Sequence, residues 1–167
     1  MTITATDADT VRIRPAGRAD LLAVLGIEQQ SFDQPWPYDA FERFLDAEAF
    51  LVAIGASGVL GYIVADRIPN HGRPIGHVKD LAVHPDRRGQ GIGSQLLDRG
   101  LDTLAAAGVT RVKLEVRVGN RPARSLYTSF GFTVHHRVPR YYDDGEDAAV
   151  MVLDIDSADR FSVAMGD

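Results

Sequence analysis

The sequence contains no cysteine, and this absence removes several kinds of chemistry. A chain without cysteine forms no disulfide framework, offers no thiolate to zinc and cannot carry an acyl group on a cysteine nucleophile. An excess of positive charge is also missing, because 18 Lys and Arg residues stand against 23 Asp and Glu residues and the net charge is -5. Neutralising a nucleic-acid backbone requires a strongly basic surface, so we expect no direct nucleic-acid partner.

Long hydrophobic runs are scarce as well. Residues 49–65 carry no charge, and this stretch is close to the minimum length of a membrane-spanning helix. Its centre at 55–58 is a Gly-Ala-Ser-Gly turn signal, and each half is a short run of Val, Ile and aromatic residues, so we predict a hairpin of two buried strands. The N-terminus carries two aspartates and no apolar core of signal-peptide length, so we expect a cytoplasmic protein without a membrane partner.

The composition that remains is typical of a globular protein. Hydrophobic residues make up 45% of the 167 residues and charged residues 25%, which excludes disorder over most of the chain. This length supports one compact domain. We expect a flexible N-terminus at residues 1–10, one domain at 11–155 and a C-terminal tail at 156–167.

The N-terminal third predicts a strand at 11–14 and two helices. The first helix begins near Asp20, an acid at the positive end of the helix dipole, and Pro35 and Pro37 must end it because proline removes a donor and disfavours helix before it. A second short helix is predicted over Tyr38–Asp46. The apolar positions of the first helix are Leu21, Leu22, Leu25 and Phe32.

The C-terminal half predicts alternating strands and helices. A strand at His77–Val83, a helix at Gly91–Ala107 and a strand over 112–118 follow one another, an order that implies a right-handed crossover and a parallel strand pair. The helix has one apolar stripe, formed by Ile92, Leu96, Leu97, Leu101 and Leu104, and Gly108 as its stop. A helix at Asn120–Phe130, capped by Asn120, and strands at Phe132–Val138 and Ala148–Asp154 complete the chain.

The segment richest in functional signal leaves a strand at Val83 and enters the long helix through Gly89, Gly91 and Gly93. Glycines let the backbone approach a bulky anion, and the first N–H groups of a helix favour negative charge, so this segment predicts a pyrophosphate cradle. A helix entry with flexible glycines is the simpler alternative. A P-loop is excluded because no lysine follows Gly93, and a dinucleotide fingerprint is excluded because Leu96 stands where a small residue is needed.

Several ordered motifs resemble a known family. The loop Arg88–Gly93 resembles the Q/R-x-x-G-x-G/A loop with which GNAT-superfamily N-acetyltransferases bind the pyrophosphate of acetyl-CoA. The rest of the chain is similar to RimI-type N-terminal acetyltransferases at Leu114–Arg117, Asn120, Ala123, Leu126–Tyr127, Gly131–Phe132, Tyr141–Tyr142, Asp144–Ala148 and Met151.

The resemblance implies an α/β GNAT fold, with a mixed, mostly antiparallel sheet, one parallel strand pair at the acetyl-CoA site and about four flanking helices. It also implies an enzyme that moves acetyl from acetyl-CoA to the N-terminal α-amino group of a protein by direct attack, without a metal. The RimI name points to a ribosomal protein as one acceptor.

Two catalytic roles follow from the resemblance. Glu115 is the general base. Because a carboxylate with a pKa of about 4.3 is a poor match to an amine, a water relay or a raised pKa is required. Tyr127 protonates the leaving thiolate, a task that suits a phenol with a pKa of about 10. Without the motif, Glu115 would be an exposed strand residue between Lys113 and Arg117, and Tyr127 a core tyrosine.

The binding residues also follow from the resemblance. Main-chain groups of Leu81, Ala82 and Val83 pair with the pantetheine arm, and an N–H near Val83 polarises the thioester carbonyl. The other cofactor contacts are Arg88, Gly89, Gln90, Gly91, Ile92, Gly93, Ser94, Asn120 and Tyr127. Phe32, Trp36 and Tyr141 border the acceptor groove, although Phe32 and Trp36 could equally be helix-packing anchors.

Metal binding is not expected. The histidines have no ligand spacing, so we expect solvated or hydrogen-bonded side chains at His71, His77, His84, His135 and His136. Two rival functions stay open. One is acetylation of lysine or a small-molecule amine by the same fold, and the other is a non-catalytic module that binds acyl-CoA.

Overall fold

A computed structural model describes residues 10–155. The expected N-terminal and C-terminal segments, apart from Thr10, lie outside these residues. In chain order the elements are β1 (Arg12–Pro15), the 3-10 helix η1 (Arg18–Asp20), α1 (Leu21–Ser31), α2 (Tyr38–Arg43), η2 (Phe44–Asp46), β2 (Ala49–Gly55), β3 (Gly58–Ile68), β4 (Ile75–Val83), η3 (Pro85–Arg87), α3 (Ile92–Ala106), β5 (Arg111–Arg117), α4 (Arg121–Ser129), β6 (Thr133–Val138) and β7 (Ala148–Asp154).

The seven strands follow the order β1-β2-β3-β4-β5-β7-β6, which confirms the predicted mixed sheet. β4 and β5 pair in parallel, as the crossover through α3 requires. The pairs β1–β2, β2–β3, β5–β7 and β6–β7 are antiparallel. The described residues group into two compact units, and β3, β4 and α3 contribute to both. The single domain expected over 11–155 therefore stays a prediction.

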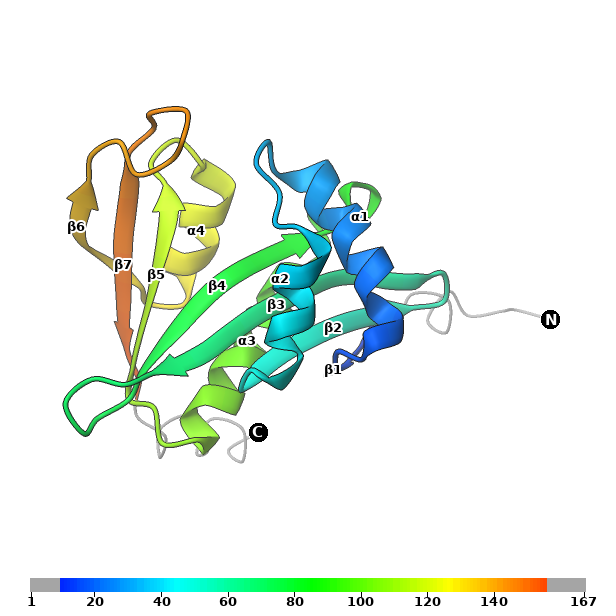
Figure 1. Ribbon diagram of the computed structural model, residues 1–167, viewed down its shortest axis with the longest axis horizontal. Coiled ribbons are helices and arrows are strands. Elements are labelled where there is room, and N and C mark those ends of the chain that lie inside the picture. The colour runs from blue at the N-terminus through cyan, green and yellow to red at the C-terminus, as the bar shows by residue number, and fades with distance from the viewer. Residues whose placement is uncertain (1–9, 156–167) are drawn as a thin grey trace. The chain divides into compact units, whose positions relative to one another are not determined.

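The first unit contains β1, β2, most of β3, the end of β4, the start of α3, and α1 with α2 (Figure 1). The predicted hairpin is confirmed: β2 and β3 pair in antiparallel fashion around the turn before Gly58. Both faces of β3 are buried, because Tyr62 and Val64 face the core cluster under α1 and α2. On the other face an added Cβ at Gly61 would lie 3.1 Å from the side chain of Leu96 in α3, which explains the unbroken apolar run.

The second unit contains the start of β4, β5, β6, β7, α4 and the end of α3. In β5 the apolar residues Val112, Leu114 and Val116 are buried, and the alternating polar residues are half-buried or exposed, as predicted. Asn120 caps α4, since its side chain accepts a hydrogen bond from the Ala123 N–H at 3.3 Å. Gly108 has a φ of +88° beyond the end of α3, which confirms the expected left-handed stop.

The predicted boundaries shift slightly in the N-terminal third. β1 begins one residue later than expected, and the second helix divides into α2 and the 3-10 helix η2. Leu22 was expected on the apolar face of α1, but it is 74% exposed. The buried positions of α1 are Leu21, Val24, Ile27 and Glu28. They have helical spacing, but one of the four carries a carboxylate.

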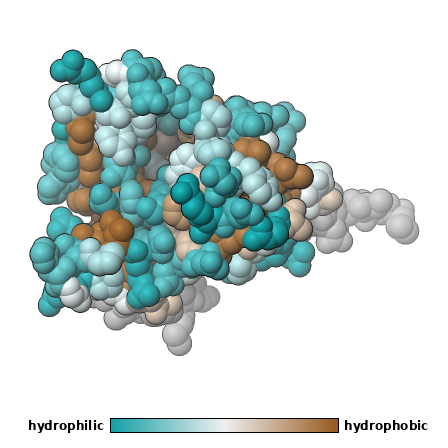
Figure 2. All heavy atoms as spheres, in the orientation of Figure 1, coloured by the Kyte–Doolittle hydropathy of each residue, from teal (hydrophilic) through white to brown (hydrophobic). Residues whose placement is uncertain are grey.

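Figure 2 shows one face of the molecule, on which hydrophilic side chains predominate and hydrophobic ones form small separate patches. Within residues 10–155, no helix has the length and apolar composition needed to cross a bilayer.

Candidate active site

The glycine loop between η3 and α3 has the backbone that the phosphate hypothesis requires. Gly89 and Gly91 have φ values of +75° and +82°, a region that residues with a Cβ rarely adopt. A Cβ at either position would meet nothing within 4 Å, so the main chain is open on that side. The helix begins at Ile92, and the N–H groups of its first turn have no partner inside the helix. The loop can therefore present N–H donors to an anion.

Side chains around this loop divide into anchored and exposed ones. Arg88 donates from Nε to the Val83 carbonyl at 3.1 Å and from its Nη2 to the Ser31 hydroxyl at 3.0 Å, so it fixes the loop to the ends of β4 and α1. Ile92 is 2% exposed, which leaves only its backbone for a ligand. Gln90 and Ser94 are exposed, and the Gln90 side chain accepts a hydrogen bond from Arg87 at 2.8 Å.

The parallel pairing between β4 and β5 is short. It covers Gly76–Val78 against Val112–Leu114, whereas β4 continues to Val83 and β5 to Arg117. Leu81, Ala82 and Val83, for which main-chain cofactor contacts are expected, thus lie on the part of β4 beyond this ladder. The Ala82 side chain is buried in the core cluster of the first unit, so backbone contact is the role left to it.

Glu115 contacts His77, a partner that the sequence motifs did not predict. Its Oε2 lies 2.6 Å from His77 Nε2 of β4, and its Oε1 accepts a hydrogen bond from Lys113 Nζ at 3.2 Å. Lys79 Nζ is 3.4 Å from the other ring nitrogen of His77. A carboxylate can only accept, so the geometry assigns a hydrogen on Nε2 of the imidazole to the contact with Glu115.

The electrostatics of Glu115 decide between the two proton routes. Burial raises its pKa, but the hydrogen bond and charge of His77, followed by those of Lys113, outweigh burial and lower the pKa to about 2. The alternative of a raised pKa is therefore wrong. The alternative of an exposed strand glutamate is also wrong, because the side chain is only 15% exposed. Glu115 is a fixed anion held by two basic side chains.

α4 places Asn120 at its N-terminus and Tyr127 in its last turns. Tyr127 is 8% exposed, and its ring packs edge-on against Phe132 with centroids 5.7 Å apart. It is therefore a core tyrosine, and its role as a proton donor stays a prediction. The Asn120 cap fixes the side chain at the turn that follows β5.

Tyr141 and Tyr142 lie in the loop between β6 and β7, with their rings edge-to-face at 5.0 Å. Tyr141 is 49% exposed, and its contact with an acceptor stays a prediction. Burial and, next in size, the charge of Glu115 raise the pKa of Tyr141, so its hydroxyl is within electrostatic reach of the carboxylate. The second unit thus contains Tyr141 as well as the contact between Glu115 and His77.

Phe32 and Trp36 pack against the core of the first unit. The Trp36 ring lies 5.4 Å from that of Phe41 and 5.3 Å from that of Phe44. The packing role is therefore confirmed, and contact with an acceptor stays a prediction.

A buried acidic cluster beneath this segment was also missed by sequence reasoning. Glu28 accepts a hydrogen bond from the Trp36 N–H at 3.1 Å and another from the Tyr62 hydroxyl. Asp80 lies beside both Glu28 and Tyr62, and its pKa is well above the usual range because of burial and the neighbouring Glu28. Asp80 Oδ2 is buried without a hydrogen-bond partner in the described residues. The sequence contained a hint of this cluster, because Glu28 interrupts the apolar face of α1 and Asp80 that of β4.

Metal ligation finds no support in the part of the chain that the structure describes, where no three His, Asp or Glu side chains gather. His77 is bound to Glu115, and His84 Nδ1 accepts a hydrogen bond from the Asp86 N–H at 3.1 Å. The rings of His135 and His136 contact each other on the exposed strand β6.

Comparison with known proteins gives a consistent result. The family described as "Acetyltransferase (GNAT) family" matches residues 21–132, more than half of the chain. An N-alpha-acetyltransferase of Sulfolobus acidocaldarius is 34% identical over 84% of this chain and 90% of its own length. The [ribosomal protein bS18]-alanine N-acetyltransferase of Escherichia coli is 33% identical over 81% of this chain and 92% of its own. The crystal structure of the ribosomal-protein-S18-alanine N-acetyltransferase from Escherichia coli superposes with a TM-score of 0.77 at 30% identity, covering 87% of this chain and 94% of that one.

Proposed function

Because the chain belongs to the GNAT acetyltransferase family, we propose that it transfers acetyl from acetyl-CoA to the N-terminal α-amino group of a protein. The relatives support this acceptor class, since one is an N-alpha-acetyltransferase and another acetylates the alanine of ribosomal protein bS18. A ribosomal protein is the acceptor to test first, and the cytoplasm, where ribosomes work, is the proposed compartment.

The observation that carries the proposal is the contact of Glu115 Oε2 with His77 Nε2 at 2.6 Å. Acyl transfer to an amine needs a group that receives a proton as the C–N bond forms. The lowered pKa of Glu115 keeps its carboxylate charged near neutral pH, and the amine nitrogen becomes positively charged on attack, so its proton is easily lost. We propose that a water carries this proton to the Glu115–His77 pair. The α-amino group is suited to this route, because it is roughly 2 to 3 pKa units more acidic than a lysine amine.

The glycine loop is the proposed site of the acetyl-CoA pyrophosphate. Its open backbone at Gly89 and Gly91, with the first-turn N–H groups of Ile92, Gly93 and Ser94, fits an anion of that size. Acetyl-CoA supplies the activated thioester. Arg88 anchors the loop, and Gln90 borders it.

The remaining cofactor residues act on the arm and the leaving group. The main chain of Leu81, Ala82 and Val83 pairs with the pantetheine, and an N–H near Val83 polarises the carbonyl. Asn120 binds the arm through its side-chain amide. Tyr127 gives its phenol proton to the departing thiolate, which is the job of a general acid.

The acceptor peptide is proposed to contact Phe32, Trp36 and Tyr141. The exposure of Tyr141 and its electrostatic interaction with Glu115 support this role.

The test uses mass spectrometry of two synthetic peptides incubated with acetyl-CoA. One begins with a free alanine and contains an internal lysine, and the matched control has the same sequence with a blocked N-terminus. We expect acetylation of the α-amine of the first peptide and no product with the control. Acetylation of lysine alone would favour the rival lysine acetyltransferase, and acetyl-CoA binding without any product would favour the non-catalytic module.

A further inference from the structure

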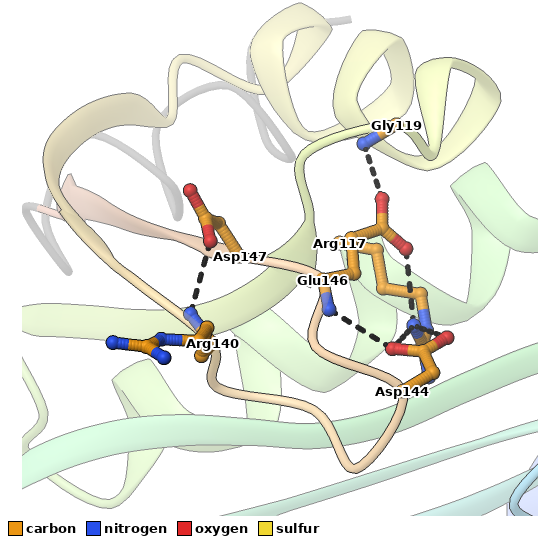
Figure 3. A network of polar contacts seen from close by, with 6 residues as sticks. All are labelled: Arg117, Gly119, Arg140, Asp144, Glu146 and Asp147. Carbon is orange, nitrogen blue, oxygen red and sulfur yellow. Dashed lines mark hydrogen bonds and ion pairs between the residues drawn. The ribbon is translucent and has the colours of Figure 1, made fainter.

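Arg117 is the hub of a polar network in the second unit (Figure 3). One guanidinium nitrogen donates to both carboxylate oxygens of Asp144, at 3.0 and 2.8 Å, and to Glu146 Oε1 at 3.0 Å. The guanidinium carbon also lies 4.0 Å from the centre of the Tyr142 ring. Arg117 therefore holds the loop between β6 and β7 at three places, through two ion pairs and one cation–π contact.

Glu146 extends this network to the turn after β5. Its second oxygen, Oε2, accepts a hydrogen bond from the Gly119 N–H at 2.9 Å. An added Cβ at Gly119 would lie 2.8 Å from the same oxygen, so a side chain there would displace the Glu146 carboxylate from this position. Gly119 directly precedes Asn120, the cap of α4 and a proposed cofactor contact. One carboxylate thus joins the tyrosine loop to the turn that begins α4.

The network reaches the reacting groups through two rings. Arg117 holds the Tyr142 ring, and that ring contacts Tyr141 edge-on. Arg117 and Glu115 are two residues apart on β5, so their side chains leave the same face of the strand. The charge of Glu115 is the second cause of the raised pKa of Tyr141, after burial, so the carboxylate acts electrostatically on this hydroxyl.

We propose that Arg117 is a positioning residue for the acceptor, because it acts through Tyr142 to hold Tyr141, a proposed acceptor contact, in place. Glu146 fixes the same loop to the Gly119–Asn120 turn, so acceptor and cofactor contacts are ordered together. The inference rests on the proposed function. It adds two charged residues that touch neither the acceptor nor acetyl-CoA.

The test is Arg117→Gln, with Arg137→Gln as the matched control. Arg137 lies on β6 and forms an ion pair with Asp147 of the same loop, with 2.7 Å between Nε and Oδ2, but its side chain is 62% exposed. Loss of Arg117 should raise the KM for an alanine-initiated peptide about tenfold, as expected for one lost charge-assisted contact, with kcat within about twofold. The control should change neither constant.

Two further variants separate positioning from a general loss of structure. Arg117→Lys keeps the charge and should recover part of the KM. Tyr142→Leu should raise the KM by itself and remove most of the additional effect of Arg117→Gln, because the arginine acts through that ring. Glu146→Gln should weaken acetyl-CoA binding in calorimetry as well, since the Gly119 N–H loses its carboxylate.

Equal KM increases in Arg117→Gln and Arg137→Gln, or an unchanged KM in Arg117→Gln, would overturn the inference. So would additive effects of the arginine and tyrosine variants. Hydrogen exchange of the Tyr142 and Gly145 amides, which bond to the Glu146 and Tyr142 carbonyls, gives a readout without turnover. Faster exchange in Arg117→Gln but not in the control is expected. If the wild type binds acetyl-CoA but acetylates no peptide, the proposed function fails, and the exchange rates still decide whether Arg117 holds the loop.

Discussion

Replacing Glu115 by Gln removes one negative charge and keeps the size of the side chain. In the native protein this carboxylate lies between His77 and Lys113, and its pKa is lowered to about 2 from its usual value of 4.5. This difference in pKa corresponds to at most about 3 kcal/mol of stability, because solvent around the partly exposed side chain weakens the interactions. The substitution should therefore lower the free energy of unfolding by up to this amount at neutral pH.

The pH dependence has a defined sign. Because the folded pKa is depressed, the contribution of Glu115 is fully present above about pH 4.5 and is lost as the pH falls through about 2. The stability difference between wild type and Glu115→Gln should therefore be largest between about pH 5 and 7 and shrink towards pH 3. Urea unfolding at a series of pH values measures it.

Asp154→Asn is the matched control for this series. Asp154 pairs with Arg111 at 3.4 Å on the neighbouring strand, but its side chain is 80% exposed. An exposed ion pair contributes about 0–1 kcal/mol, so the control should show a small difference at every pH. A loss in Glu115→Gln that is no larger than that in the control, or that grows as the pH falls, would refute the electrostatic account of Glu115.

The same variant tests the chemistry. Loss of a general base or its water relay should lower kcat by about 10²- to 10⁴-fold, whereas acetyl-CoA affinity should be unchanged because the carboxylate has no proposed contact with the cofactor. Steady-state kinetics with the alanine-initiated peptide and calorimetry with acetyl-CoA measure the two quantities. Wild-type turnover in Glu115→Gln would exclude Glu115 from proton transfer.

Three other substitutions, the first of them with a matched control, give separate outcomes. Gly91→Asp places a side chain and a negative charge where the φ is +82°, so the acetyl-CoA affinity measured by calorimetry should fall by at least about tenfold. The control is Gly108→Asp, which has a similar backbone strain at a φ of +88° beyond the other end of α3 and should bind acetyl-CoA normally. Tyr127→Phe should lower kcat by about 10²-fold without changing acetyl-CoA binding, and an unchanged kcat would remove it as the acid. Glu28→Gln weakens the bonds to Trp36 and Tyr62, so urea unfolding should show a loss of about 1–3 kcal/mol, and a higher KM for the peptide would link that segment to the acceptor.

Local signals in the sequence were sufficient for most elements of the fold. The apolar stripe of α3 is buried from Ile92 to Leu104 because its spacing matches the helical period and nothing polar interrupts it. Gly108 and Asn120 mark helix ends by mechanisms that involve only neighbouring residues. The glycine loop is a local feature too, and its positive φ values could be expected from its sequence.

Polar residues that are buried by tertiary contacts were harder to predict. In α1 the apolar Leu22 is exposed, whereas the acidic Glu28 lies on the face that meets the core. Burial of this carboxylate is possible because the hydroxyl of Tyr62 in β3 donates a hydrogen bond to it. Residue 62 is far from residue 28 in the chain, and a helical pattern holds no information on such a partner. The observable hint is that Glu28 and Asp80 each stand at an apolar position of their element.

The electrostatic state of Glu115 depends on strand register, which the motifs do not contain. β4 and β5 pair His77 with Lys113, so Glu115 is two residues beyond the pair on the same face as His77. A slip of one residue would replace His77 with a side chain of the opposite face. Gly76, which pairs with Val112 in the same ladder, fits the close packing there, because a Cβ would lie 2.9 Å from Leu104 and 3.1 Å from both Val109 and Val112. The register of this ladder therefore brings the imidazole within 2.6 Å of the carboxylate and, with Lys113, lowers the pKa of Glu115.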